Sequence, residues 1–169
     1  MRIVLLILIA LGSVFATFGQ IAPKGWRFPD QCDIKRRWKA YVKEKKTVPY
    51  RIAADFNGDR FRDEAWILIS TEREDGLGLF VFFGSKKGLG EARLLGESGI
   101  APQAMHIRAL KPGKYRTACF YGYWDCTEEE PQLLRLKTSG IIYAMIGEST
   151  AVNYWNANNR KFYVAQLTH

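Results

Sequence analysis

Ala65-Trp66-Ile67-Leu68-Ile69 is an apolar run without a polar position, composed largely of aromatic and branched side chains. Successive side chains of a strand point to opposite faces, so a strand that is apolar at every position is buried on both faces. A second run of this kind, Leu79-Phe80-Val81-Phe82-Phe83, follows after the turn residues Glu74-Asp75-Gly76. The two runs predict a pair of central strands.

Outward from this pair, shorter runs rich in β-branched and aromatic residues alternate with Gly, Asn, Asp and Pro. Turn signals recur about every 8 to 12 residues, a spacing typical of antiparallel β folds. The predicted strands are 50–54, 64–71, 77–84, 92–95, 103–110, 114–120, 132–137, 141–146, 151–155 and 161–167. We expect a mainly β fold, with an antiparallel meander that forms a sandwich, a barrel or a propeller-like sheet.

One segment before these strands shows helical spacing instead. Apolar residues in 30–46 fall at i, i+4, i+7 and i+8, namely Ile34, Trp38, Tyr41 and Val42. The spacing predicts one N-terminal amphipathic helix near 30–46, with a basic outer face that we interpret as solvated. No shift in composition marks a second domain, so residues 20–169 are predicted to form a single all-β domain with this helix.

Residues 1–19 have the order of a secretory signal peptide: Arg2, an apolar run over 3–11, and small residues near Ala16. The apolar run is shorter than the roughly 18 to 20 residues that a spanning helix needs. We expect cleavage within 16–20, no stable membrane span afterwards, and a periplasmic or secreted mature protein. An uncleaved membrane anchor is the alternative.

The charge balance bears on the partner. Lys and Arg number 25 and Asp and Glu number 17, a net charge of +8, or +7 once Arg2 is removed. Exported proteins rarely meet nucleic acid, so we expect no nucleic-acid partner. A basic exported protein indicates an acidic protein partner or the anionic cell envelope.

The segment 55–64 carries oxygen-bearing side chains at positions 1, 3, 5 and 9, with a backbone carbonyl at position 7. This spacing lets a chain wrap a hard cation such as Ca²⁺. The candidate metal ligands are Asp55, Asn57, Asp59 and Asp63 through their side chains and Phe61 through its carbonyl. The bidentate Glu of an EF-hand is missing, because position 12 is Trp66.

These residues resemble the Asp-Phe-Asn-Gly-Asp-Gly calcium loop of bacterial VCBS and FG-GAP repeat proteins, which leads straight into an apolar strand. The resemblance covers residues 55–69 and implies a structural Ca²⁺ on the ligands named above. The family has Gly at the sixth position, where the turn favours positive φ, whereas this chain has Arg60. The alternative is a metal-free Asx-type turn in which Asp55 and Asn57 accept backbone amides.

Three cysteines follow the predicted signal. Cys119 and Cys126 enclose a short segment with a glycine and are predicted to form a disulfide in an oxidising compartment. Closing so small a ring stabilises a fold by about 2 to 3 kcal/mol. Cys32 is left as a buried free thiol or as a competitor for one of the other two.

We find no catalytic motif, and the chain is predicted not to be an enzyme. The two histidines are His106, within a strand pattern, and His169, the last residue. The adjacent carboxylates Glu128, Glu129 and Glu130 are most simply solvent-facing. A glycan-acting hydrolase with unrecognised carboxylates stays open, because such carboxylates have no local motif.

The segment between Cys119 and Cys126 holds the candidate partner-binding residues Tyr121, Tyr123 and Trp124. Tyr and Trp are enriched at interface hot spots, although such residues also fold inward as core. The chain is similar in architecture and compartment to periplasmic lysozyme inhibitors and related immunity proteins, a weaker analogy. Our leading hypothesis is an exported calcium-associated inhibitor or immunity-type protein that neutralises a cell-wall hydrolase or another protein, and the alternative is an envelope glycan-binding or adhesion module.

Overall fold

The computed structural model describes residues 20–30, 33, 50–99, 105–145 and 150–168. The predicted signal peptide, Cys32 and nearly all of the predicted helix at 30–46 lie outside these residues. Within the described ranges, the chain forms no helix with the length and apolar character needed to cross a bilayer.

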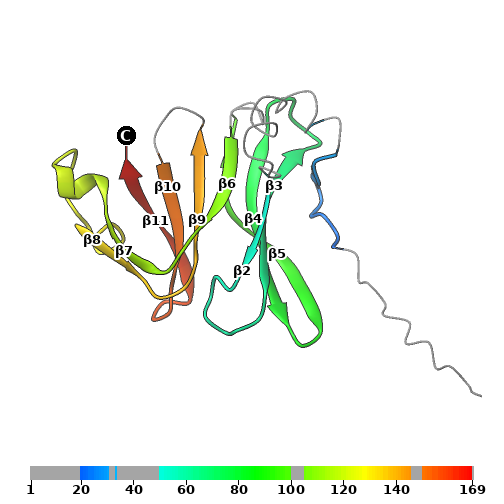
Figure 1. The fold of residues 1–169 in the computed structure, drawn as a ribbon. Coiled ribbons are helices and arrows are strands. Elements are labelled where there is room, and N and C mark those ends of the chain that lie inside the picture. The colour runs from blue at the N-terminus through cyan, green and yellow to red at the C-terminus, as the bar shows by residue number, and fades with distance from the viewer. Residues whose placement is uncertain (1–19, 31–32, 34–49, 100–104, 146–149, 169) are drawn as a thin grey trace, which may run out of the picture.

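The first sheet, called sheet A, contains the two apolar runs at its centre (Figure 1). Its strands are β1 (Trp26–Arg27), β2 (Arg51–Ala54), β3 (Asp63–Ser70), β4 (Leu77–Ser85) and β5 (Gly88–Ser98). The order is β1-β3-β4-β5, and β2 pairs with the same strand β3. Neighbouring positions of β3 are buried on opposite faces, since Ile67 and Leu68 are both 0% exposed and belong to different core clusters. The two predicted central strands are confirmed.

The second sheet, called sheet B, has the order β11-β10-β9-β6. Its strands are β6 (Met105–Leu110), β9 (Gly140–Met145), β10 (Thr150–Asn156) and β11 (Lys161–Thr168). The strands β7 (Gly113–Arg116) and β8 (Leu133–Leu136) form a separate two-stranded ribbon. All pairings are antiparallel, so the predicted mainly β antiparallel fold is confirmed.

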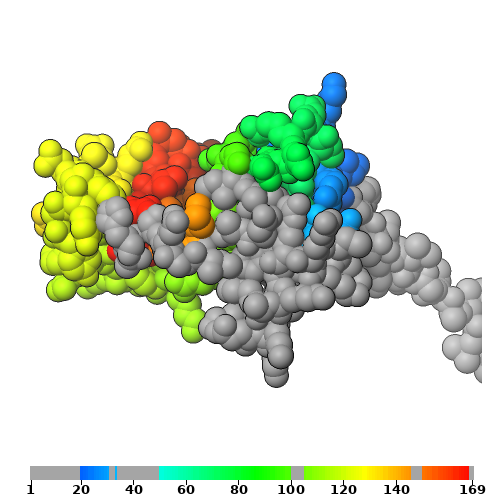
Figure 2. Space-filling model, turned by 90° about the horizontal axis from the view of Figure 1, so that it is seen from above, coloured from blue at the N-terminus to red at the C-terminus, as the bar shows by residue number. Residues whose placement is uncertain are grey.

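Alternation along β9 explains the layering. Ile141 belongs to the core that sheet A and sheet B share, whereas the next residue, Ile142, belongs to the core between sheet B and the ribbon. Tyr115 and Leu134 of the ribbon pack into that second core. Both views place the ribbon at the end of the molecule away from sheet A (Figures 1 and 2).

The N-terminal segment, residues 20–29, covers the outer face of sheet A. Trp26 meets Phe80 edge-on at 5.1 Å between ring centroids, and Phe28 meets Trp66 at 4.8 Å. Trp26 and its neighbour also pair with the end of β3 as the short strand β1. Because two paired residues have too little length to show a period of two, the sequence pattern did not reveal this strand.

The predicted strand 114–120 is wrong over its second half. β7 ends at Arg116, and Ala118–Tyr121 form a short 3-10 helix, η2. The amide of Phe120 donates to the carbonyl of Thr117 at 3.1 Å, and the amide of Gly122 donates to that of Cys119 at 3.0 Å. These turn hydrogen bonds replace the ladder, because the chain must bend to close the disulfide.

Candidate functional site

The disulfide loop, residues 119–126, is the main candidate site. The predicted Cys119–Cys126 disulfide is present, with the two Cα atoms 5.2 Å apart. η2 ends at Gly122, which has φ of 80°, a left-handed conformation that suits glycine because it has no Cβ. The chain therefore reverses within the loop and returns towards β8.

The base of this loop is anchored in the fold. The Thr117 hydroxyl donates to the carbonyl of Pro131 at 2.8 Å, and the Tyr154 hydroxyl of β10 donates to the carbonyl of Glu129 at 2.6 Å. Burial raises the pKa of Tyr154 to about 12, so this hydroxyl stays a donor at neutral pH. Ala118 is 0% exposed beneath the loop. The loop is a fixed extension of the β structure.

The aromatic side chains of the loop are exposed, although its base is buried. Tyr121 is 58% exposed and Tyr123 is 57% exposed, while Phe120 and Trp124 are 41% and 40% exposed. The alternative prediction from the sequence is that two or three of these aromatic side chains pack into the core. None of the four is buried, so the loop exposes four aromatic side chains at the end of the ribbon.

Contacts within the loop and with the residues on either side of it hold three of these rings in place. Phe120 and Tyr121 meet edge-on at 5.2 Å between centroids, and the Arg116 guanidinium lies 4.5 Å over the Phe120 ring. The indole N–H of Trp124 donates to Glu130 Oε1 at 3.1 Å. Side chains ordered before binding lose less entropy when a partner docks.

The acidic loop at 55–64 forms a tight turn around its own carboxylates. Asp55 accepts the amides of Gly58 at 2.6 Å and Arg60 at 3.0 Å. Asn57 Oδ1 accepts the amide of Asp59 at 3.0 Å, and Asp59 Oδ1 accepts that of Phe61 at 2.8 Å. The structure thus brings four of the five predicted ligand residues together in one turn.

Asp63 has a different role from the other predicted ligands. It is 0% exposed, and its two oxygens accept the amides of Phe56 and Gly84, each at 2.8 Å. Burial raises the pKa of the Asp63 carboxyl, the two amides lower it, and the charges of Asp59 and Asp55 raise it further. Asp63 therefore ties the loop to the end of β4.

The sixth position of the acidic loop has a positive φ, although the residue there is Arg60 and not glycine. Arg60 has φ of 72°, in the left-handed region that the resemblance leads one to expect there. L-residues in this region carry a strain of roughly 1–2 kcal/mol. The Thr138 hydroxyl donates to the carbonyl of Phe56 at 2.9 Å and holds the turn against the rest of the fold.

The fit of this turn to Ca²⁺ can be judged from its oxygens. The side-chain oxygens of Asp55, Asn57 and Asp59 that accept one N–H each keep a second lone pair, which suits a hard cation. Three cations, Arg60, Arg135 and Lys137, line the same cleft of about 610 Å³ and oppose a bound cation. Within the described residues, no group of three or more His, Cys, Asp and Glu side chains is arranged to hold a metal ion. Calcium binding stays a prediction.

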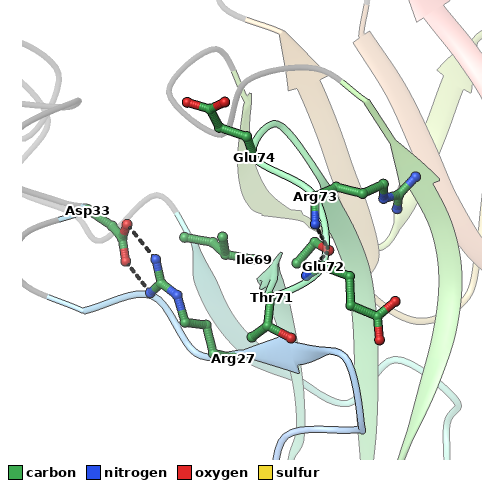
Figure 3. A pocket seen from close by; sticks show the side chains of 8 residues that line it. Arg27, Asp33, Ile69, Thr71, Glu72, Arg73 and Glu74 are labelled. Atoms are coloured by element: carbon green, nitrogen blue, oxygen red, sulfur yellow. Dashed lines mark hydrogen bonds and ion pairs between the residues drawn. The ribbon is translucent and has the colours of Figure 1, made fainter.

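A further pocket lies between the N-terminal segment and the turn after β3 (Figure 3). Arg27 spans its edge and binds Asp33 through two hydrogen bonds of 2.6 and 3.0 Å. The carboxylates of Glu72 and Glu74 point away from each other in Figure 3, so they do not form an acid–base pair in this arrangement. We interpret this pocket as part of the structural contact between the N-terminal segment and sheet A.

His106 is half-buried on β6, as the strand pattern predicted. Burial lowers the pKa of its imidazole, and the charge of Arg108 lowers the pKa further. Both effects disfavour the charged form of the imidazole. Arg108 of β6 lies near Lys114 and Arg116 of β7 at a pocket beside the disulfide loop, a proximity that no local sequence pattern indicates.

No family model, curated protein or solved structure matches this chain. The function is therefore inferred from the residues of the chain itself.

Proposed function

We propose that this chain is an exported binding protein of the periplasm or the extracellular space that docks on a partner protein through its disulfide loop. Neutralisation of a cell-wall hydrolase, in the manner of an inhibitor or immunity protein, is the outcome we propose for this docking. The proposal is carried by one observation: four aromatic side chains of the loop are 40–58% exposed on a base that is buried and hydrogen-bonded.

The shape of the site favours a protein partner over a glycan. The loop connects the two strands of the ribbon, which lies at one end of the molecule (Figure 1), and its four aromatic side chains are exposed there. Small-ligand sites are concave, whereas an outward loop suits insertion into the cleft of another protein. Arg116 covers one face of Phe120, and Phe120 meets Tyr121 edge-on, which reduces the flat ring area that a sugar would stack on.

The acidic loop has a supporting role in this proposal. Asp55, Asn57 and Asp59, with the carbonyl of Phe61, would hold a structural Ca²⁺ that stiffens the turn before β3. The cations nearby favour weak binding, in the range of about 10⁻⁴ to 10⁻³ M that is found for extracellular modules. No catalytic step is assigned to the ion.

The test compares three forms of the mature protein immobilised on beads and exposed to an envelope extract. The loop variant carries Tyr121→Ser and Tyr123→Ser, and the matched control carries Leu94→Ser and Val164→Ser, which replace two exposed apolar residues elsewhere. We expect a protein retained by the wild type and the control and lost from the loop variant. The eluted protein should degrade purified peptidoglycan, and added wild type should slow that degradation.

Two outcomes would overturn the proposal. Equal retention by all three forms would show that the loop is not the docking surface. Retention of peptidoglycan fragments without a protein, abolished in the loop variant, would assign the same aromatics to glycan binding instead.

A further inference from the structure

The turn of the acidic loop contains the dipeptide Asn57-Gly58, a pair that is chemically labile in a flexible chain. A backbone nitrogen attacks the side-chain carboxamide of the asparagine before it, and glycine hinders this attack least because it has no Cβ. Asn57 is half-buried and Gly58 is exposed. Gly58 has φ of 85°, a conformation that favours glycine, so the turn itself requires the labile pair.

The nucleophilic atom of this reaction is held by Asp55. The amide nitrogen of Gly58 donates to Asp55 Oδ1 at 2.6 Å. This nitrogen attacks only after it has lost its proton, and a carboxylate that accepts the proton in a hydrogen bond stabilises the N–H form. The negative charge of the carboxylate also opposes the amide anion that proton loss creates. Asp55 therefore suppresses the step that starts the reaction.

The electrophilic group, the carboxamide of Asn57, is held at both of its ends by Asp59. Its Nδ2 donates to Asp59 Oδ2 at 2.9 Å, and its Oδ1 accepts the amide of Asp59 at 3.0 Å. The two hydrogen bonds resist the rotation that carries Cγ of Asn57 towards the Gly58 nitrogen. Nδ2 must gain a proton to leave, and an ionised carboxylate beside it has none to give.

We infer that Asn57 is a deamidation site that the folded loop keeps unreactive, with Asp55 and Asp59 as its protecting residues. When the loop opens, the Gly58 nitrogen loses its proton to solvent and forms a bond to Cγ of Asn57. The Cγ–Nδ2 bond breaks, and Nδ2 takes up a proton and leaves as ammonia. Water then opens the resulting succinimide at one of its two carbonyl carbons, which gives aspartate or isoaspartate at position 57.

The modification makes an opening of the loop permanent. Both products carry a carboxylate in place of the carboxamide, and this new negative charge is repelled by Asp55 and Asp59 in the same turn. The isoaspartate product also adds one methylene carbon to the main chain, which changes the spacing of the turn. The reaction involves the acidic loop alone, so it is independent of docking through the disulfide loop.

The test compares the folded mature protein with the same protein in guanidinium chloride, both incubated at mildly alkaline pH. Peptide mapping by mass spectrometry measures the conversion of Asn57, with synthetic aspartate and isoaspartate peptides as standards. Asn158 is exposed in the β10–β11 turn and is followed by Asn159, so it is an internal reference with a bulkier neighbour. We expect Asn57 to convert faster than Asn158 in denaturant, and about tenfold or more slowly in the folded protein, because the loop must first open.

Two variants test the protecting residues in the folded protein. Asp55→Ala frees the Gly58 amide, and Asp59→Ala frees the side-chain nitrogen of Asn57. The matched control, Asp75→Ala, removes an equal charge from the exposed turn after β3. We expect conversion to rise about tenfold in each loop variant, because each loses a hydrogen bond to a carboxylate, and to stay unchanged in the control.

Circular dichroism checks that the variants keep the β fold. Asp55→Asn, which keeps the shape of the side chain and loses its charge, takes the place of a loop variant that does not fold, and it should also speed conversion. Equal rates for Asn57 in the folded and the denatured wild type would overturn the inference. So would loop variants that convert no faster than Asp75→Ala, or an Asn57 that converts no faster than Asn158 in denaturant.

Discussion

Asp63 Oδ1 accepts the amide of Gly84 at 2.8 Å, and this hydrogen bond joins the end of the acidic loop to the end of β4. The other oxygen of the same buried carboxylate accepts the amide of Phe56. A Cβ at Gly84 would lie 2.3 Å from the carbonyl oxygen of Arg62, so the close approach needs glycine there. A residue that the loop spacing marks as a metal ligand thus serves to connect two strands.

Asp63→Ala is expected to destabilise the fold by about 2–4 kcal/mol, because it leaves two amides without their acceptor in a buried place. The exposed Asp75→Ala is the control and is expected to change stability by less than about 0.5 kcal/mol. Urea unfolding followed by circular dichroism measures both. Similar midpoints for the two variants would show that water satisfies the two amides.

Arg60→Gly is expected to stabilise the protein by about 0.5–1 kcal/mol, because it relieves the backbone strain at φ 72°. Part of this gain is lost, because glycine raises the conformational entropy of the unfolded chain. Arg62→Gly, two residues further on in the same loop, removes an equal charge and serves as the control. It is expected to be neutral or destabilising, because Arg62 does not have a positive φ. Stabilisation by both variants would point to charge rather than backbone strain.

Ca²⁺ at 5 mM is expected to raise the melting temperature by about 3 °C if its dissociation constant is about 1 mM, and excess chelator is expected to reverse the shift. The double variant Asp55→Asn and Asp59→Asn should lose the response. Glu74→Gln with Asp75→Asn, on the turn after β3, should keep it. If neither Ca²⁺ nor chelator changes the melting temperature of the wild type, the loop is a metal-free Asx-type turn.

Removal of the disulfide by Cys119→Ser with Cys126→Ser is expected to cost about 2.5 kcal/mol of stability, as estimated for a ring of this size. The β fold should persist, because both main cores lie outside the loop. Wild type in reductant should unfold at the same denaturant concentration as the double variant. Loss of the far-ultraviolet β signal in either case would mean that the disulfide is needed for folding.

His106 is expected to titrate below the ordinary imidazole pKa of 6.5, because burial and Arg108 both disfavour its charged form. Its lowered pKa contributes stability that is present above pH 6.5 and lost as the pH falls through the folded value. Arg108→Gln should raise the pKa, whereas the remote Lys86→Gln should not. Proton NMR of the imidazole resonances measures these values, and a pKa above 6.5 in the wild type would contradict the burial.

Much of the fold follows from local pattern. The apolar runs around Ile67 and Val81 are buried on both faces in the structure, and the turn signals separate nearly all of the strands. The candidate site is only partly local. The ring between Cys119 and Cys126 is visible in the sequence, but the exposure of Tyr121 and Tyr123 is not, because the same aromatics suit a core as well as a surface.

The sequence by itself determined the antiparallel β character, the central position of β3 and β4 and the short disulfide, because each depends on residues close together in the chain. Only the tertiary structure decided that Asp63 binds Gly84 and that Arg108 shares a pocket with Lys114. It also placed sheet B between sheet A and the ribbon. These relationships depend on which faces pack together, and side-chain alternation specifies that a face is buried without specifying its partner.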